Sequence, residues 1–178
     1  MRIISGRLRG KVIHAPANLP VRPTTDFAKT ALFNILHNYF DFENVSVLDL
    51  FCGTGNISYE FASRGCENMT AVDADGHCVK FVKETMSKLG MKGTHVFKSD
   101  VFKFLSAVPG KYDIIFADPP YELQETDKLP ALVKEHSMLN ENGWLIIEHQ
   151  SRRKLESEWL PAEVRTYGNC AFSIFKAE

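Results

Sequence analysis

The stretch Val47-Leu48-Asp49-Leu50-Phe51-Cys52-Gly53-Thr54-Gly55-Asn56 decides the fold of this chain. Its first half belongs to a nearly continuous apolar run over residues 45–51, which is typical of a strand buried in a parallel sheet. Gly53 and Gly55 allow the backbone to turn sharply after that strand and to approach a ligand closely. Helical spacing follows from about Asn56 and ends at Gly65. The stretch therefore predicts a strand, a ligand-binding loop and a helix.

Strands and helices continue to alternate along the rest of the chain. Strands are expected over residues 69–72, 95–98, 112–117 and 144–148, with helices over 77–89, after Asp100 and within 129–139. Two final runs, 164–167 and 171–175, flank Gly168-Asn169, which is a hairpin signal. Alternating strands and helices predict a mostly parallel sheet with helices on both faces. The predicted fold class is thus α/β and Rossmann-like, with an antiparallel C-terminal hairpin.

The residues before the deciding stretch form a separate pattern. Residues 3–14 contain two short strand-like runs around Gly6 and Gly10, which predicts an N-terminal basic β-hairpin. A proline-containing loop follows, and Thr24, Thr25 and Asp26 are possible N-caps of a helix. We expect one domain over residues 1–178, with the hairpin and loop at 1–23, a leading helix at 24–44 and the catalytic core at 45–178.

Length and composition exclude several classes of protein. A chain of 178 residues with 44% hydrophobic residues can bury a complete core as one domain without disulfides or metal. No apolar run reaches the roughly 18 residues that a membrane span requires, and the first residues lack the apolar stretch of a signal peptide. We therefore expect a cytoplasmic protein without a membrane partner. Its four cysteines have no CxxC spacing, so neither a metal site nor a disulfide framework is expected.

Charge is distributed unevenly along the chain. The formal net charge is −1, but residues 1–30 carry +5 and the remaining residues carry −6. A basic arm on an acidic body suits contact with nucleic-acid phosphates. The alternative is a solvated hairpin whose charge is incidental. The predicted RNA-binding residues are Arg2, Arg7, Arg9, Lys11 and Arg22, and Arg152-Arg153-Lys154 is the next candidate surface.

A carboxylate stands at the end of the second and of the third predicted strand. Asp73 comes twenty residues after Gly53, where it could accept hydrogen bonds from both ribose hydroxyls of an adenosyl group. Asp100 could reach an adenine amine, or could only cap the helix that follows. Because parallel strands end at one edge of the sheet, these carboxylates predict an adenosyl site at that edge. The predicted cofactor-binding residues are Asp49, Gly53, Gly55, Asn56, Asp73, Ala74, Asp100 and Val101.

Asp118-Pro119-Pro120-Tyr121 directly follows the fourth predicted strand and indicates the chemistry. Each proline favours extended backbone in the residue before it, so the Asp118 carboxylate and the Pro119 carbonyl can form a rigid pair of acceptors. Two acceptors match the two hydrogens of an NH₂ group, and Tyr121 offers a ring on which a base could stack. Hydrogen bonds to an aromatic amine favour the pyramidal nitrogen, with its lone pair aimed at a methyl donor. These four residues are the predicted catalytic residues, and a base within a helix would have to be flipped out to reach them.

Nearly the whole chain resembles a family of small bacterial RNA methyltransferases, the RsmD-like, guanine-966-N2 family that modifies 16S ribosomal RNA. The segments that carry this resemblance are 1–6, 22–26, 31–36, 47–55, 63–65 and 118–121, and the N-terminal ones are the most family-specific. The resemblance implies a class I methyltransferase fold, S-adenosylmethionine as the cofactor and the basic hairpin as an RNA-binding element. It also implies 16S ribosomal RNA or the small ribosomal subunit as the partner. We expect no obligate protein partner. One departure is a tail that ends soon after the last strand, which leaves little besides the hairpin for RNA contact.

Three other interpretations remain open. A DNA or RNA adenine-N6 methyltransferase would use the same amine pocket, but the DNA enzymes usually need a target-recognition domain for which this chain has no room. A nicotinamide-dependent oxidoreductase shares the glycine-rich loop, but Ser58 stands where the third glycine of its fingerprint would be. A catalytically silent RNA-binding scaffold of the same fold is disfavoured by the intact Asp118 and the intact glycines.

Overall fold

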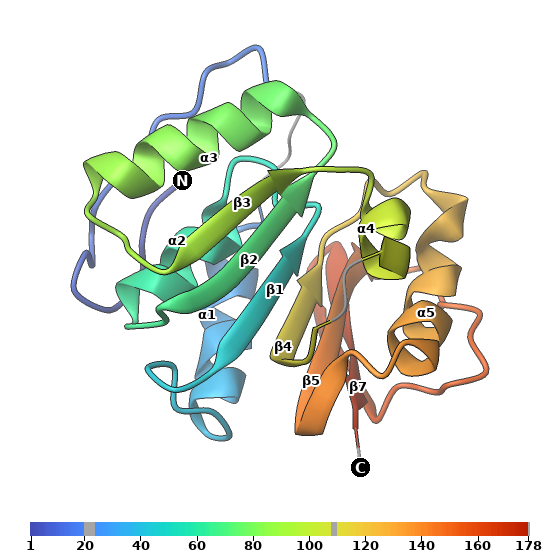
Figure 1. Ribbon diagram of the computed structural model, residues 1–178. Coiled ribbons are helices and arrows are strands. Elements are labelled where there is room, and N and C mark those ends of the chain that lie inside the picture. Colours follow the sequence, from blue (N-terminus) through green and yellow to red (C-terminus); the bar gives the residue numbers. More distant parts are fainter. Residues whose placement is uncertain (20–23, 108–109, 178) are drawn as a thin grey trace.

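A seven-stranded sheet in the order β3-β2-β1-β4-β5-β7-β6 forms the centre of the computed structural model, which describes residues 1–19, 24–107 and 110–177 (Figure 1). The strands are β1 Ser46–Leu50, β2 Asn68–Asp73, β3 Thr94–Lys98, β4 Tyr112–Ala117, β5 Leu139–Gln150, β6 Glu163–Tyr167 and β7 Cys170–Lys176. Strands β1 to β5 pair in parallel, whereas β7 pairs antiparallel with both β5 and β6. The predicted mixed sheet with an antiparallel C-terminal hairpin is confirmed.

The strand order reverses between β1 and β4. From β1 the chain moves outward to β2 and β3, and it then returns to place β4 on the other side of β1. At such a reversal the loops after the two central strands diverge, and open α/β sheets bind ligands at that point. The order therefore directs attention to the carboxyl ends of β1 and β4.

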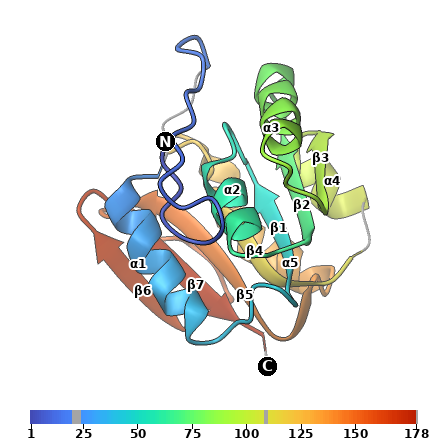
Figure 2. The ribbon, with the colours of Figure 1, turned by 90° about the vertical axis from the view of Figure 1, so that its left-hand side faces the viewer.

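Helices cover both faces of this sheet. Helices α1 Asp26–His37, α2 Asn56–Ser63 and α3 Gly76–Lys88 pack on one face, and α4 Val101–Ala107 and α5 Leu129–Glu135 pack on the other. A short 3₁₀ helix, η1 Gln124–Lys128, precedes α5. Figure 2 shows α1 lying across the β5–β7 part of the sheet, where Tyr39 and Phe40 just after it contact Trp144 of β5. Within the described residues, no helix is long and apolar enough to cross a membrane.

Side-chain alternation along the strands builds a separate apolar core on each face. Ile114 and Phe116 of β4 point toward α1, α2 and α3, where they join Phe33 and Phe61. Ile115 and Ala117, the intervening residues, point toward α4 and α5. Asp118 directly follows Ala117, so the alternation places it on the face covered by α1 and α2.

The N-terminal segment folds back on itself but forms less regular structure than the predicted β-hairpin. Its two arms share one antiparallel bridge, between Arg2 and Val12, with backbone hydrogen bonds on either side of it. Other backbone groups of the segment bond to α2: the Arg7 N–H donates to the carbonyl of Ser63. Gly6 has a φ of 82°, and a Cβ there would lie 1.9 Å from that same carbonyl oxygen. The turn is thus packed against α2 at Gly6, while Arg7, Arg9 and Gly10 remain exposed.

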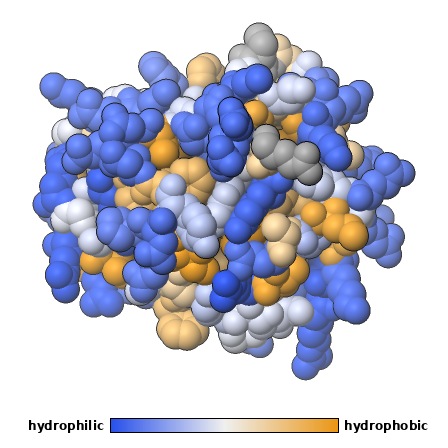
Figure 3. Space-filling view, turned by 90° about the horizontal axis from the view of Figure 1, so that it is seen from below, coloured by the Kyte–Doolittle hydropathy of each residue, from blue (hydrophilic) through white to orange (hydrophobic). Residues whose placement is uncertain are grey.

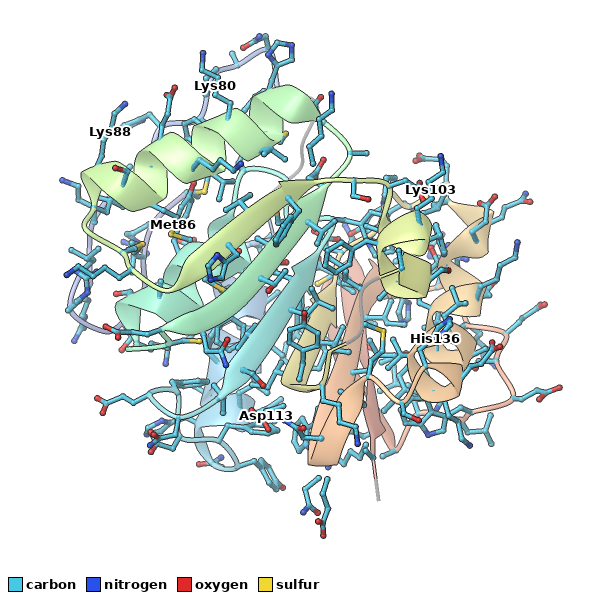
Figure 4. All side chains as sticks on the ribbon, in the orientation of Figure 1. Lys80, Met86, Lys88, Lys103, Asp113 and His136 are labelled. Atoms are coloured by element: carbon cyan, nitrogen blue, oxygen red, sulfur yellow. The ribbon has the colours of Figure 1, made fainter. Side chains whose placement is uncertain are left out.

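The amino ends of the strands lie at the end of the molecule opposite the carboxyl ends of β1 and β4. Figure 3 views this end from below and shows a mixture of hydrophilic and hydrophobic groups. Asp113, labelled there in Figure 4, accepts hydrogen bonds from the Ser46 N–H and from Asn140. Burial opposes ionisation of this carboxyl, but the hydrogen bonds outweigh it and lower the pKa of Asp113. Asp113 therefore connects the starts of β1, β4 and β5, at the opposite end of these strands from the candidate ligand-binding edge.

Candidate functional site

The glycine-rich loop after β1 and the Asp118 motif after β4 lie side by side. The Asp118 N–H donates a 3.3 Å hydrogen bond to the Leu50 carbonyl, which extends the parallel pairing of Ala117 with Leu50. In Figure 1 this edge is the end toward which the arrows of β1 and β4 point. Two motifs that are far apart in the sequence therefore form one site at the predicted edge of the sheet.

The glycine-rich loop adopts backbone conformations that require its glycines. Gly53 and Gly55 have φ values of 51° and 84°. A Cβ at Gly55 would also lie 2.8 Å from the ring of Tyr59, so this position excludes side chains on two grounds. Gly55 stands just before α2 and is its N-cap residue. The first N–H groups of α2 and the loop backbone thus face the edge where a ligand would sit.

Asp73 at the end of β2 fixes the shape of this loop. One of its carboxylate oxygens accepts a 2.8 Å hydrogen bond from the Gly53 N–H, and the other accepts one of 2.8 Å from the Asp75 N–H. Asp73 remains half-exposed, so it can also meet a ligand at the same edge. Asp75 is engaged differently, because its side chain caps α3 by accepting from the N–H groups of His77 and Cys78.

Asp49 is buried beneath the loop. Its carboxylate is only 2% exposed and accepts a hydrogen bond from the hydroxyl of Ser58 in α2. Burial, together with the charge of Asp73, raises the pKa of Asp49 to about 7 despite the Ser58 hydrogen bond. Ser58 is the residue that replaces the third glycine of the dinucleotide fingerprint, and its hydroxyl is the partner that a buried carboxylate needs. Asp49 therefore supports the loop from below.

The other predicted cofactor-binding residues are distributed around the same edge. Ala74 is exposed after β2, and Val101 is buried at the start of α4. Asp100 is exposed, and its carboxylate accepts from the Lys103 N–H, so it caps α4 at the turn marked by Lys103 in Figure 4. Asn56 is buried and holds the N-terminal region, since its side chain donates to the Thr24 carbonyl and accepts from Lys29.

Asp118 is half-buried among other acids. Burial first, and then the negative charges of Glu148 and Asp49, raise its pKa well above the ordinary value for a carboxyl. Pro119 is buried and Pro120 is exposed, so the chain turns outward within the motif. The Asp118 carboxyl therefore binds a proton more tightly than an ordinary aspartate does.

The chain after this motif is held by Arg153. Its guanidinium donates to the carbonyls of Tyr121 and Leu123, at 3.3 and 3.0 Å, and pairs with Asp127 at 3.2 Å. The Leu123 N–H closes the turn by donating to the Pro120 carbonyl. The sequence marks Arg153 only as a member of a basic triplet and a candidate for phosphate contact. In the structure it instead braces the turn that presents Tyr121.

Glu148 is the site residue that sequence reasoning missed. It lies near the end of β5, is 4% exposed, and accepts a 2.7 Å hydrogen bond from the Thr24 hydroxyl. The available signal was an acidic residue at the end of a predicted buried strand, the same signal that marked Asp73 and Asp100. Its location beside Asp118 depends on the order of the strands, which the sequence alone does not provide.

The predicted RNA-binding residues have different environments. Arg2 pairs with Asp26 at the surface, and Arg7 donates to the carbonyls of Leu89 and Gly90 at the end of α3. Arg9 and Lys11 are exposed and form no ion pair within the described part of the chain. Arg22 lies outside the described residues.

Additional basic side chains continue this surface on α3. Figure 4 shows Lys80 and Lys88 pointing away from the sheet, and Arg7 brings the N-terminal turn against the C-terminal end of the same helix. Because Arg7 is engaged in this contact, fewer side chains of the N-terminal segment offer free positive charge than its sequence suggests.

Comparison with known proteins identifies the family. A family profile described as conserved hypothetical protein 95 matches residues 1–176. The chain belongs to this family. A Bacillus subtilis member named "Putative rRNA methyltransferase YlbH" is 34% identical over 183 residues, which cover 99% of this chain and 98% of that protein. Ribosomal RNA small subunit methyltransferase D of Escherichia coli is 24% identical and covers 100% of this chain. The resemblance to the RsmD-like family is therefore confirmed.

Solved structures agree with this membership. A hypothetical protein of Thermus thermophilus superposes with a TM-score of 0.86 at 26% identity, over 99% of both chains. The 16S rRNA N2 G1207 methyltransferase RsmC of Thermus thermophilus, in complex with AdoMet and guanosine, superposes with a TM-score of 0.70 at 21% identity. That similarity covers 90% of this chain and 45% of the RsmC chain. The family member described here thus has the class I methyltransferase fold.

Proposed function

We propose that this protein transfers a methyl group from S-adenosylmethionine to the exocyclic N2 amine of a guanine in 16S ribosomal RNA. The observation that carries the proposal is the hydrogen bond between the Asp118 N–H and the Leu50 carbonyl, because it fixes the amine-binding motif against the cofactor loop. Family members named as ribosomal RNA methyltransferases support an RNA substrate. The solved complex of RsmC with AdoMet and guanosine supports this pairing of cofactor and base.

The residues at the edge of the sheet fit an adenosyl group. Gly53 and Gly55 give the loop its sharp turn through positive φ angles, and Asp73 at the end of β2 provides a carboxylate for ribose hydroxyls. Asp100 and Val101 stand at the end of β3, where an adenine ring would lie. The cofactor supplies a methyl group that is already activated by a positively charged sulfur. The protein therefore needs to position the acceptor nitrogen and does not need to generate a strong electrophile.

Asp118 and Pro119 position the target amine. Their two oxygens accept the two N–H groups, which favours the pyramidal nitrogen and directs its lone pair along the line of transfer. The sulfonium of S-adenosylmethionine would supply the methyl group and leave as a neutral thioether, and the methylated nitrogen would then lose one proton. Asp118 is the carboxyl nearest that proton, and its raised pKa makes it a suitable acceptor. Tyr121 provides a ring against which the base can stack.

RNA phosphates contact the N-terminal segment and the adjacent face of α3. The exposed side chains of Arg9 and Lys11 provide positive charge there, with Lys80 and Lys88 on the neighbouring helix. The target guanine leaves its stack to reach the edge of the sheet, as any buried base must before reaction on its amine.

The test is to map methylated guanines in small-subunit ribosomal RNA from cells with and without this gene. Cells that express Asp118→Asn at the same level serve as the inactive control. The proposal predicts one N2-methylguanine that disappears in both the deletion and the variant strain. Loss of a methylated adenine instead, or no change in either strain, would refute it.

A further inference from the structure

Glu148 and Asp118 occupy neighbouring positions on the same face of the sheet. Strands β4 and β5 pair in parallel, with Phe116 opposite Ile146 and Ala117 opposite Ile147. One step further along both strands places Asp118 beside Glu148. Adjacent strands lie about 4.8 Å apart, so the two side chains extend from neighbouring backbones toward the same space.

Independent contacts agree with this placement. Burial first, and then the negative charges of Glu148 and Asp118, raise the pKa of the Cys170 thiol of β7 to about 11, as expected if both carboxyls lie near it. Thr24, which holds the Glu148 carboxylate, is in turn held through its carbonyl by Asn56 at the start of α2. Glu148 thus lies between the N-terminal end of α1 and Asp118, at the end of β5.

The edge of guanine that carries the N2 amine presents a second donor beside it. Guanine has an N1–H adjacent to the N2 amine, whereas adenine has an unprotonated N1 beside its N6 amine. A pocket that receives the guanine amine must therefore also receive the N1–H. Carboxylates are the side chains that accept such a donor most strongly.

We propose that Glu148 accepts the N1–H of the target guanine while Asp118 and Pro119 accept the N2 amine, so that Glu148 selects guanine against bases that lack an N1 hydrogen. This inference rests on the proposed function. A carboxylate has about four acceptor positions, so the hydrogen bond from the Thr24 hydroxyl is compatible with a second one from the base. The Thr24 bond also restricts rotation of the carboxylate.

Burial makes this selection strong. The Glu148 side chain is almost completely removed from water, so a base with an acceptor at N1 would face it without a compensating hydrogen bond. Sites that are built to accept a substrate hydrogen reject analogues without it far more strongly than apolar pockets reject a change in shape. A carboxylate at this position therefore distinguishes guanine from bases that lack an N1 hydrogen. A second proline or an aliphatic side chain at the same position would not make that distinction.

The experiment replaces the target guanine with 2-aminopurine, which has the same exocyclic amine but an unprotonated N1. Splint ligation introduces the analogue into small-subunit RNA at the guanine located by the mapping experiment. Single-turnover methylation is then measured on both RNAs for the wild type and for Glu148→Gln. The amide of glutamine can donate to N1 of 2-aminopurine, so the variant should lose activity on guanine and keep or gain activity on the analogue.

We expect the guanine-to-2-aminopurine rate ratio to fall by about 100-fold or more in Glu148→Gln. Glu163→Gln, the same substitution at an ion-paired position on β6, is the matched control and should leave the ratio unchanged. Thermal melting establishes that each variant is folded. A purely structural role for Glu148 would lower both rates together and leave the ratio at its wild-type value, and that outcome would overturn the inference. If wild-type protein methylates no guanine, the proposed function itself fails, which is a different result.

Discussion

The ammonium group of Lys29 and the carboxylate of Glu60 lie 3.3 Å apart, and their side chains are 1% and 0% exposed. Glu60 also accepts from the N–H groups of Ile4 and Ser5, and Lys29 donates to the Arg2 carbonyl. This buried pair therefore attaches the N-terminal segment to α1 and α2. The N-terminal segment, with its basic side chains, is thus a fixed part of the domain.

Lys29→Met should destabilise the fold strongly. It removes the ammonium partner of the buried Glu60 carboxylate, which keeps Arg64 at 2.9 Å as its remaining cation, so the cost should approach but not exceed the roughly 3–5 kcal/mol typical of a broken buried pair. Urea unfolding measures the change in free energy. Lys80→Met is the matched control, because Lys80 forms an exposed pair with Glu84, and it should change stability by about 0.5 kcal/mol at most. Equal effects of the two substitutions would contradict the anchoring role of Lys29.

Asp118→Asn should lower the rate of methyl transfer by about two to four orders of magnitude. The substitution keeps the size of the side chain but places an NH₂ donor where the target amine needs an acceptor. Because the interaction strengthens as charge develops, the rate should fall more than RNA binding does. Single-turnover kinetics and cofactor titration on one preparation test both statements. Cofactor affinity should stay within a few-fold, and a folded variant with a near wild-type rate would refute the amine-pocket assignment.

Asp73→Ala should weaken binding of S-adenosylmethionine by roughly 2–4 kcal/mol. The substitution removes the carboxylate assigned to the ribose hydroxyls and also frees the Gly53 N–H that shapes the loop. Calorimetry measures the affinity. Asp75→Asn is the control, because asparagine also caps helices and Asp75 serves α3. Unchanged affinity in Asp73→Ala would move the ribose contact to another residue.

Asp49→Asn should stabilise the protein more at alkaline than at acid pH. The pKa of Asp49 is about 7 in the fold, raised from an ordinary value of 3.8, so the folded protein holds this proton more tightly than the unfolded chain. Stability from this group is therefore lost as the pH rises from about 4 to 7. Asparagine does not ionise and can still accept from Ser58. The gain in unfolding free energy over the wild type should be about 2–3 kcal/mol larger at pH 8 than at pH 5, and a gain independent of pH would show that Asp49 titrates normally.

Replacing Arg9 and Lys11 together with alanine should weaken RNA binding and reduce its salt dependence. Each lost phosphate contact lowers the slope of log affinity against log salt by roughly 0.7–0.9. Filter binding across a salt series measures that slope. Arg7→Ala should act differently, because its guanidinium bonds to the end of α3 and its loss mainly affects packing of the turn. An unchanged slope in the double variant would assign the phosphates to another surface.

Local sequence patterns were sufficient for the order and type of the main elements. The apolar run that ends at Phe51, the glycines that follow it and the repeated alternation of strand and helix each depend on residues close together in the chain. The same holds for the Asp118 motif, whose two prolines restrict the backbone wherever the motif is placed. The N-terminal hairpin was predicted less accurately, because its backbone groups bond to Glu60 and Ser63 in α2 and not only across the turn.

The sequence by itself determined the class of fold, the glycine-rich loop, and the location of Asp73 and Asp118 at strand ends on one edge of the sheet. Only the tertiary structure decided which polar and charged groups meet: Thr24 with Glu148, Lys29 with Glu60, and Arg153 with the turn after Tyr121. The physical reason is sequence separation. A contact such as that of Thr24 with Glu148, 124 residues apart, depends on the order of the strands and on the face that each helix covers. Those are properties of the packed sheet, and no local pattern of residues encodes them.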